Sequence, residues 1–500
     1  MGGESPSDRT AEPAGRFTSP ARGVLLGVAG RAVYFAAGYL ASIVLARRLG
    51  PSDYGSYGII MSVLLWIEQI GKFTFAPAVA KLLPERRAGA ERLEQTASSL
   101  SLLLFATFFV LLWLAAPPLA RIFDVGETGV RWFRIAALDL PIFGWYALGR
   151  SVLLGRRDFL GATVADALYS SMKFLGAVIF LMIWLSVASA LVVNIFASVV
   201  AWLFLVSRRP IAFGRLRSGE AGPLARLALP MAFYMMMLQT LGSLDLWLLK
   251  ALRLETSDPT LGLYVVARNV ALVPAVVFMV VSDVLLPSLS GALAAGDADR
   301  ARRYLQGAVR FLWLTLLPVC ALFALGADTI MSVLYSGRFE EGGLYLRLVI
   351  WYALALPFLD LFASALTARG EPFLSGRTLL LLLPAALLVN VLVIPAFGAV
   401  GAAVASAAIG LAGALLLGLL IYRRFGSFLT IRTIVSSAVA LLLMLGLASR
   451  LSFPGPLLVV SYAGCLAAYL GVLVLLGAVT RQELTSLAWW LPQRPQMTRT

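Results

Sequence analysis

Ionisable side chains occur inside the most apolar stretches of this 500-residue sequence, where few other residues could do chemistry. A charge inside a membrane costs about 2.5–3.5 kcal/mol on insertion scales, so such residues usually face a partner or a water-filled space. The basic residues that we single out are Arg31, Lys72, Lys173 and Arg268. Arginine and lysine suit a phosphate group because they form charge-assisted hydrogen bonds with its oxygens. We therefore predict that these four residues line a cavity and bind a phosphate-bearing substrate.

Three carboxylates in the same stretches are candidates for ion coupling: Glu68, Asp166 and Asp245. Glu68 lies four residues before Lys72, and Asp166 lies seven residues before Lys173, so each pair shares one face of a helix. A carboxylate beside a cavity cation can exchange a proton or a sodium ion for that partner. The alternative is that these groups form structural ion pairs without a ligand. For Asp245, near the end of its predicted helix, snorkelling to the membrane surface is a further alternative.

The composition argues against catalysis. The sequence contains no histidine, the side chain used most often for acid–base catalysis and for binding transition metals. Its two cysteines, Cys320 and Cys465, fall in apolar runs without metal-site spacing, so we expect buried thiols. We predict no catalytic residue, no metal site and no cofactor.

Hydrophobic segments must position the candidate residues. Hydrophobic residues make up 60% of the chain and charged residues only 13%, and one bilayer crossing needs roughly 20 apolar residues. This pattern predicts an all-α integral membrane protein with about fourteen transmembrane helices. They are expected at residues 23–46, 55–78, 98–117, 132–154, 159–182, 185–206, 225–249, 260–286, 305–329, 343–367, 374–396, 399–421, 430–449 and 456–478.

Basic residues gather in alternate connections, for example RRAGAER, GRRD, RRPIAFGRLR and DADRARR. Because Lys and Arg in short loops stay on the cytoplasmic side, we predict a multi-pass protein of the cytoplasmic (inner) membrane with both termini in the cytoplasm. The net charge of +15 then reflects orientation and not a nucleic-acid partner. Tryptophans near the predicted helix ends, Trp247 among them, fit the aromatic belt of a membrane protein.

An internal repeat divides the chain. The segment LARRLGPSDYGSYG has a counterpart in LLKALRLETSDPTLGLYVVARN, with Gly55 and Tyr57 aligned to Gly262 and Tyr264. Six predicted helices separate the copies, so both halves enter the membrane in the same direction and form two pseudo-symmetric six-helix bundles. We predict a disordered cytoplasmic tail at 1–22, an N-terminal lobe at 23–206, a basic cytoplasmic linker at 207–224, a C-terminal lobe at 225–421, two further helices within 422–480 and a cytoplasmic tail at 481–500.

Several strings, taken in order, resemble a known family: LARRLGPSDYGSYG, LDLWLLKAL, GLYVVARNVALVP, LYSGRFEEGGLYLRLV and IPAFGAVGAAVAS. They are similar to the polysaccharide-biosynthesis flippases of the O-antigen and exopolysaccharide (Wzx) type, in the multidrug/oligosaccharidyl-lipid/polysaccharide (MOP) exporter superfamily. The resemblance runs from residue 23 to residue 480. It implies a MOP/MATE-like fold and alternating-access transport of undecaprenyl-diphosphate-linked oligosaccharide.

The resemblance also implies a site and partners. Basic residues of the central cavity would hold the diphosphate, and by position Arg31, Lys72, Lys173 and Arg268 are the candidates. The expected partners are the lipid-linked oligosaccharide, membrane lipids, and polysaccharide polymerase and chain-length proteins, with no nucleic acid.

Four other functions are alternatives to this one, and one of them is a non-transporting membrane scaffold in which the buried charges are fully paired. A cation-coupled multidrug exporter of the same superfamily would need an acid-rich, aromatic-lined cavity, whereas basic residues are in excess at depth here. A lipid II flippase would have similar cavity cations, so it remains an alternative. A membrane glycosyltransferase, polymerase or ligase would need longer outer loops than this sequence offers. We therefore predict a flippase and not an enzyme.

Overall fold

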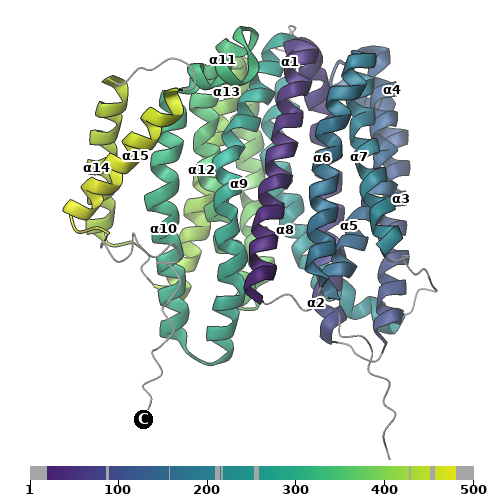
Figure 1. Ribbon diagram of the computed structural model, residues 1–500, viewed down its shortest axis with the longest axis horizontal. Coiled ribbons are helices and arrows are strands. Elements are labelled where there is room, and N and C mark those ends of the chain that lie inside the picture. Colours follow the sequence, from purple (N-terminus) through teal and green to yellow (C-terminus); the bar gives the residue numbers. More distant parts are fainter. Residues whose placement is uncertain are drawn as a thin grey trace, which may run out of the picture.

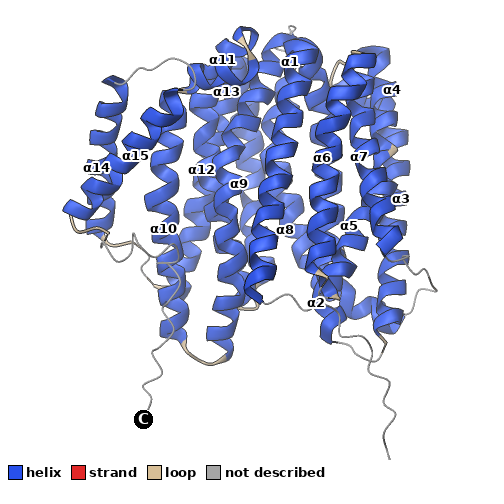
Figure 2. Ribbon diagram, viewed as in Figure 1, coloured by secondary structure: helices blue, strands red, loops and turns tan. Residues whose placement is uncertain are grey.

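Long helices that run side by side form the molecule (Figure 1). The computed structural model describes residues 20–85, 89–156, 158–208, 214, 218–252, 258–426, 429–450 and 457–479. Within these residues the regular structure is entirely helical, without a strand (Figure 2). The all-α prediction is thus confirmed. The predicted tails at 1–22 and 481–500 lie outside these residues, except that Pro20–Arg22 already belong to the first helix.

The described residues form fifteen α-helices and one short 3-10 helix, η1. Their bounds are α1 Pro20–Thr74, α2 Ala76–Glu85, α3 Ala90–Ile122, α4 Gly126–Ala137, α5 Asp139–Gly155, α6 Phe159–Ile183, α7 Val187–Arg208, α8 Ser218–Ala251, α9 Asp258–Ala294, α10 Ala298–Leu325, α11 Ala327–Tyr335, η1 Gly337–Gly342, α12 Gly343–Ala368, α13 Pro372–Phe425, α14 Ile431–Arg450 and α15 Leu457–Leu475.

Two of these helices each contain two predicted crossings. The chain turns back at Gly50 in α1 (φ 80°) and at Gly398 in α13 (φ 55°), conformations that glycine adopts because it has no Cβ. Eleven helices in the described part of the chain are long and apolar enough to cross a membrane. Dividing α1 and α13 at their glycines adds two crossings to these eleven, and α5, with 17 residues, is the fourteenth. The prediction of about fourteen crossings is confirmed.

Short helices at the ends of the bundle were not predicted. The predicted crossing at 55–78 ends at Thr74, and α2 follows it as a separate helix. The predicted crossing at 132–154 is divided at Leu138 into α4 and α5. The charged residues of α4, such as Arg131 and Arg134, make this helix amphipathic, which explains why it does not continue the apolar crossing.

The bundle has two halves (Figure 1). Helices α3 to α7 lie on one side, α9, α10, α12 and α13 lie on the other, and the α14–α15 hairpin stands at the far edge beside α10. α1 belongs to the first half, where it packs mainly against α6, and α8 belongs to the second half, where it packs mainly against α13. α1 also packs against α8 and α9 and so lies at the boundary between the halves. We call the end where α3, α6, α8 and α10 begin the basic end, since Lys81, Arg92 and Arg302 lie there, and the opposite end the outer end.

The two copies of the sequence repeat face each other between the halves. A Cβ at Gly262 would strike the main chain of Pro51, and a Cβ at Gly58 would lie 2.7 Å from Val265 Cγ2. Glycine at these two positions therefore allows α1 and α9 to approach closely, and this approach brings the two halves together near the outer end.

Candidate functional site

A cluster of four charged residues, which we call the Glu68 cluster, lies in the first half. Glu68 on α1 and Asp139 at the start of α5 are 3% and 0% exposed. Glu68 interacts electrostatically with Asp139, with Lys173 of α6 and with Lys72, and Asp139 also interacts with Lys173. The structure thus brings together three predicted site residues and adds Asp139. Two carboxylates balance two ammonium groups when all four are charged.

Asp166 lies in a separate group of hydrogen bonds. Arg150 Nε, on α5, donates to its two carboxylate oxygens at 2.5 and 2.7 Å, and Tyr146 Oη donates to it at 2.7 Å. The partner of Asp166 is therefore Arg150, not Lys173 as the sequence spacing suggested. Arg150 is not among the predicted site residues, although it lies inside the predicted crossing at 132–154 and the cost of a charge in the membrane applies to it equally. This group ties α5 to α6.

Asp245 forms the centre of a third group, in the second half. It is 2% exposed, accepts hydrogen bonds from Tyr264 Oη and from Ser406 Oγ (2.7 Å), and lies 3.4 Å from Arg268 Nη1. Arg268 Nη2 also donates to the carbonyl oxygen of Gly242. The snorkelling alternative for Asp245 is wrong, because the side chain is buried. No sequence pattern pointed to Ser406, which comes from α13.

The four predicted basic residues are not all placed together. Lys72 and Lys173 share the Glu68 cluster, whereas Arg268 is held by Asp245 and by main-chain oxygen in the other half. The side chain of Arg31 lies outside the described part of the chain. The predicted set of four cations is thus divided between the halves as far as its side chains are described.

Two tryptophans join the halves, each two residues from a central carboxylate. Trp66 Nε1 on α1 donates to Thr240 Oγ1 on α8 at 3.0 Å, and Trp247 Nε1 on α8 donates to Ser62 Oγ on α1 at 2.9 Å. The indole rings meet edge to face, with centroids 5.9 Å apart. The belt interpretation of Trp247 is therefore wrong, since this residue lies between the halves and binds a hydroxyl there.

Further contacts close the outer end. Arg47, after the first crossing of α1, donates to the carbonyl oxygens of Val333 and Leu334 at 2.7 and 2.8 Å. Asn269 Nδ2 on α9 donates to Tyr54 Oη on α1 at 3.0 Å. Polar bonds therefore join the halves from the outer end down to the tryptophans.

At the basic end, the first turns of α8 pack against helices of the first half. Leu224 is fully buried there in an apolar cluster with Val79 and Leu83 of α2, Leu93 of α3 and Leu148 of α5. α8 therefore touches the first half at both ends, through apolar packing at the basic end and through the tryptophan pair further out.

A sequence model of the polysaccharide biosynthesis proteins matches residues 44–342. The chain belongs to the polysaccharide biosynthesis protein family. The matched stretch holds the Glu68 cluster, the Arg150–Asp166 pair and the Asp245–Arg268 pair, so the family resemblance expected from the sequence is confirmed over the part that carries these groups. None of the curated proteins matches the chain in sequence.

Solved structures show where this family member fits by fold. The chain is similar to the lipid II flippase MurJ in an inward closed conformation, with a TM-score of 0.75 and 15% identity over 92% of this chain and 100% of that one. An inward-facing MATE family multidrug resistance transporter of the MOP superfamily is similar with a TM-score of 0.67 and 15% identity, over 79% of this chain and 98% of that one. A third similar structure is a MOP superfamily transporter from Pyrococcus furiosus, which is described as having a binding pocket of reverse polarity. Its TM-score is 0.60 and its identity 15%, over 82% of this chain and 95% of that one. The predicted MOP/MATE-like fold is confirmed, and these neighbours are transporters and a flippase, not enzymes.

Proposed function

We propose that this multi-pass membrane protein is a flippase that moves an undecaprenyl-diphosphate-linked oligosaccharide across the cytoplasmic membrane by alternating access. Membership of the polysaccharide biosynthesis family supports the oligosaccharide part of the substrate. The fold shared with a lipid II flippase supports a lipid-linked substrate. Polysaccharide polymerase and chain-length proteins are the partners that such a function requires, and they remain predictions.

The observation that carries the proposal is the Glu68 cluster, in which the buried Glu68 and Asp139 lie with Lys72 and Lys173 inside the membrane-spanning part of this family member. A diphosphate has the same sign of charge as Glu68 and Asp139, so it competes with these carboxylates for the two lysines. Lysine binds phosphate as a point charge, and the interaction is stronger where water is excluded. Separation of the two halves would expose the cluster to the substrate.

The same competition links ion binding to substrate binding. When Glu68 and Asp139 take up protons or a sodium ion, Lys72 and Lys173 are released to bind the diphosphate, so ion and substrate binding favour each other. Asp166 and Asp245 are less suited to this role, because hydrogen bonds from arginine, tyrosine and serine already satisfy them. Arg268 would reach a substrate only after its pair with Asp245 opens, and Arg31 remains a predicted contact.

A reconstitution assay tests the proposal. The protein is placed in liposomes that contain a fluorescent undecaprenyl-diphosphate oligosaccharide, and transfer between leaflets is followed by quenching. Loss of one charge-assisted contact costs about 1.5–3 kcal/mol, so Lys72→Gln and Lys173→Gln should each slow transfer roughly ten- to a hundredfold. Lys81→Gln is the matched control, because this lysine is exposed on α2 at the basic end.

Three results would contradict the proposal. Equal transfer by Lys72→Gln, Lys173→Gln and Lys81→Gln would remove the two lysines of the Glu68 cluster from the substrate site. Uptake of organic cations without transfer of any diphosphate lipid would favour the multidrug exporter. Faster transfer of lipid II than of the oligosaccharide lipid would identify the lipid II flippase instead. If Lys173→Gln alone does not fold, the double variant Glu68→Gln/Lys173→Gln removes the same lysine and keeps the charge balance of the cluster.

A further inference from the structure

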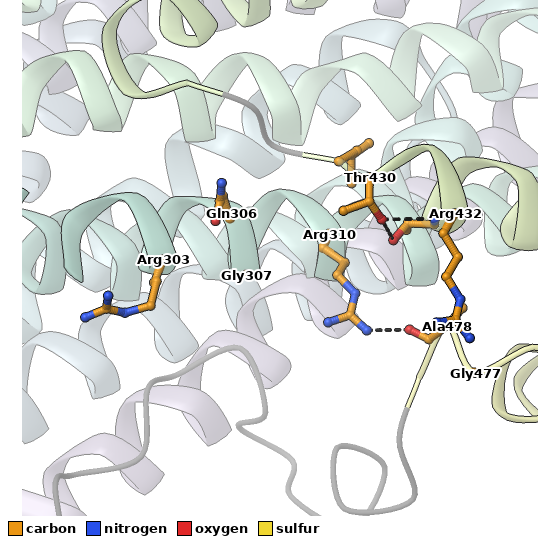
Figure 3. A pocket seen from close by; sticks show the side chains of 10 residues that line it. Arg303, Gln306, Gly307, Arg310, Thr430, Arg432, Gly477 and Ala478 are labelled. Carbon is orange, nitrogen blue, oxygen red and sulfur yellow. Dashed lines mark hydrogen bonds between the residues drawn. The ribbon is translucent and has the colours of Figure 1, made fainter. Parts of the chain in front are cut away.

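A pocket lies outside the groups described above, between α10 and the α14–α15 hairpin (Figure 3). Its volume is about 420 Å³. Arg310 on α10 donates from Nη2 to the carbonyl oxygen of Ala478, and Arg432 on α14 donates from Nη2 to that of Leu476 at 2.9 Å. Both guanidinium groups therefore meet at the end of α15, where Figure 3 shows them on either side of Ala478.

The lining of the pocket suits an anion. It includes three arginines, two threonines and a glutamine, and none of its ten residues is acidic; the residues are Arg303, Gln306, Gly307, Arg310, Leu429, Thr430, Arg432, Thr433, Gly477 and Ala478. A guanidinium group carries five N–H donors in a planar fork that matches the oxygens of a phosphate group. Arg310 on α10 and Arg432 on α14 thus present their guanidinium groups to the same space.

Gly477 keeps this space open. Its φ of 64° lies in the left-handed region, and a Cβ at this position would strike Arg432 Nη2. Any other residue would therefore both strain the main chain and displace the guanidinium group. The end of α15 is shaped around Arg432.

The pocket lies where the membrane-embedded part of α10 begins. Arg310 is the last charged residue of that helix, and the apolar run from Phe311 to Leu325 follows it directly. Above the pocket, α14 and α15 expose large apolar side chains, including Leu442 (71%) and Val459 (73%). A cationic pocket below an apolar surface matches an amphiphile that has an anionic headgroup and hydrocarbon chains.

We propose that this pocket binds the phosphate headgroup of an anionic lipid, with the lipid chains along the exposed faces of α14 and α15. Basic pockets between transmembrane helices commonly hold anionic headgroups on the cytoplasmic side. The hairpin packs on α10 through its own apolar cluster, which includes Leu314, Met444 and Tyr469. A headgroup that bridges Arg310 to Arg432 adds a second attachment between the hairpin and α10.

Native mass spectrometry of the full-length protein tests this site. The protein is titrated with phosphatidylglycerol, phosphatidylcholine, farnesyl diphosphate and inorganic diphosphate. Each basic side chain contributes about 1 kcal/mol to anionic lipid binding, so Arg303→Gln/Arg432→Gln should bind phosphatidylglycerol or farnesyl diphosphate at least about tenfold more weakly. Lys81→Gln/Arg92→Gln removes two exposed charges at the same end of the molecule and should bind like the wild type.

The lipid arms identify the source of the headgroup. Preferential binding of phosphatidylglycerol assigns the pocket to bulk phospholipid, and preferential binding of farnesyl diphosphate assigns it to a prenyl carrier. Equal binding by the pocket variant and the control variant overturns the proposal. The proposal is also overturned if phosphatidylcholine binds as tightly as phosphatidylglycerol. It is overturned as well if inorganic diphosphate binds as tightly as phosphatidylglycerol or farnesyl diphosphate. If the double variant does not fold, Arg432→Gln alone serves, because this side chain is exposed.

Discussion

Buried carboxylates in this protein differ in what surrounds them, and that difference separates structural residues from those suited to transport. Asp166 and Asp245 each receive several hydrogen bonds and lie close to an arginine. Glu68 and Asp139 lie beside each other with lysine as their nearby cation. Arginine stays charged and presents a fixed fork, whereas lysine is a single mobile charge that another anion can recruit. The two kinds of pair therefore predict different mutant behaviour.

The Arg150–Asp166 pair should contribute to stability. Arg150→Gln leaves Asp166 without its cation, with side chains that are 24% and 17% exposed in the wild type. Breaking a buried pair costs about 3–5 kcal/mol, and partial exposure reduces this to about 2–3 kcal/mol here. Arg150→Gln should therefore lower the melting temperature in detergent, and the double variant Arg150→Gln/Asp166→Asn should recover part of the loss. An unchanged melting temperature for Arg150→Gln would mean that the pair has no structural role.

Element lengths follow from the sequence because a crossing must be long and apolar, whatever its neighbours are. The fourteen crossings and the close approach of the repeated segments both derive from such local features. Pairing partners were harder to predict, because the rotation of each helix decides which side chains meet. The spacing of Asp166 and Lys173 was compatible with a pair, yet α5 presents Arg150 to Asp166 and leaves Lys173 to the Glu68 cluster. The sequence does not predict the position of Trp247 for the same reason, because its place between the halves depends on how α8 packs against α1.

The Trp66–Trp247 contact should stabilise the conformation in which α1 and α8 lie together. Each indole donates one hydrogen bond across the halves, and a typical hydrogen bond contributes about 1 kcal/mol, or roughly a fivefold change in the ratio of two conformations. Trp66→Phe and Trp247→Phe remove the donors but keep an aromatic ring. Each should raise the population that is open at the outer end, and the double variant should raise it further.

Spin labels at the outer end measure this effect. Labels on Arg48→Cys and Arg338→Cys, both at exposed positions of the two halves, report the separation by double electron–electron resonance. The two native cysteines are buried, so they interfere little. Trp202→Phe is the control, because Trp202 stacks on Trp145 within the first half. The same distance distribution in all three variants would show that the tryptophans do not hold the halves together.

At the scale of the whole molecule, charge is unequal between the two ends of the bundle. The described part of the basic end carries Lys81, Arg92, Arg302, Arg369 and Arg423, and Arg303 of the α10–hairpin pocket lies in the second turn of α10 at the same end. Lys and Arg in short connections are retained on the cytoplasmic side of a membrane. The anionic lipid site that we propose and the predicted orientation therefore depend on the same asymmetry and can be tested separately.

Cysteine accessibility tests the orientation. Glu127→Cys, at the start of α4 on the outer end, and Ala295→Cys, between α9 and α10 on the basic end, both lie at exposed positions. In intact cells a membrane-impermeant maleimide should label Glu127→Cys, and it should label Ala295→Cys only after permeabilisation. The native thiols, Cys320 and Cys465, are buried and give a low background. The opposite labelling pattern would place the basic end outside, and the Glu68 cluster would then have to receive its substrate from the other leaflet.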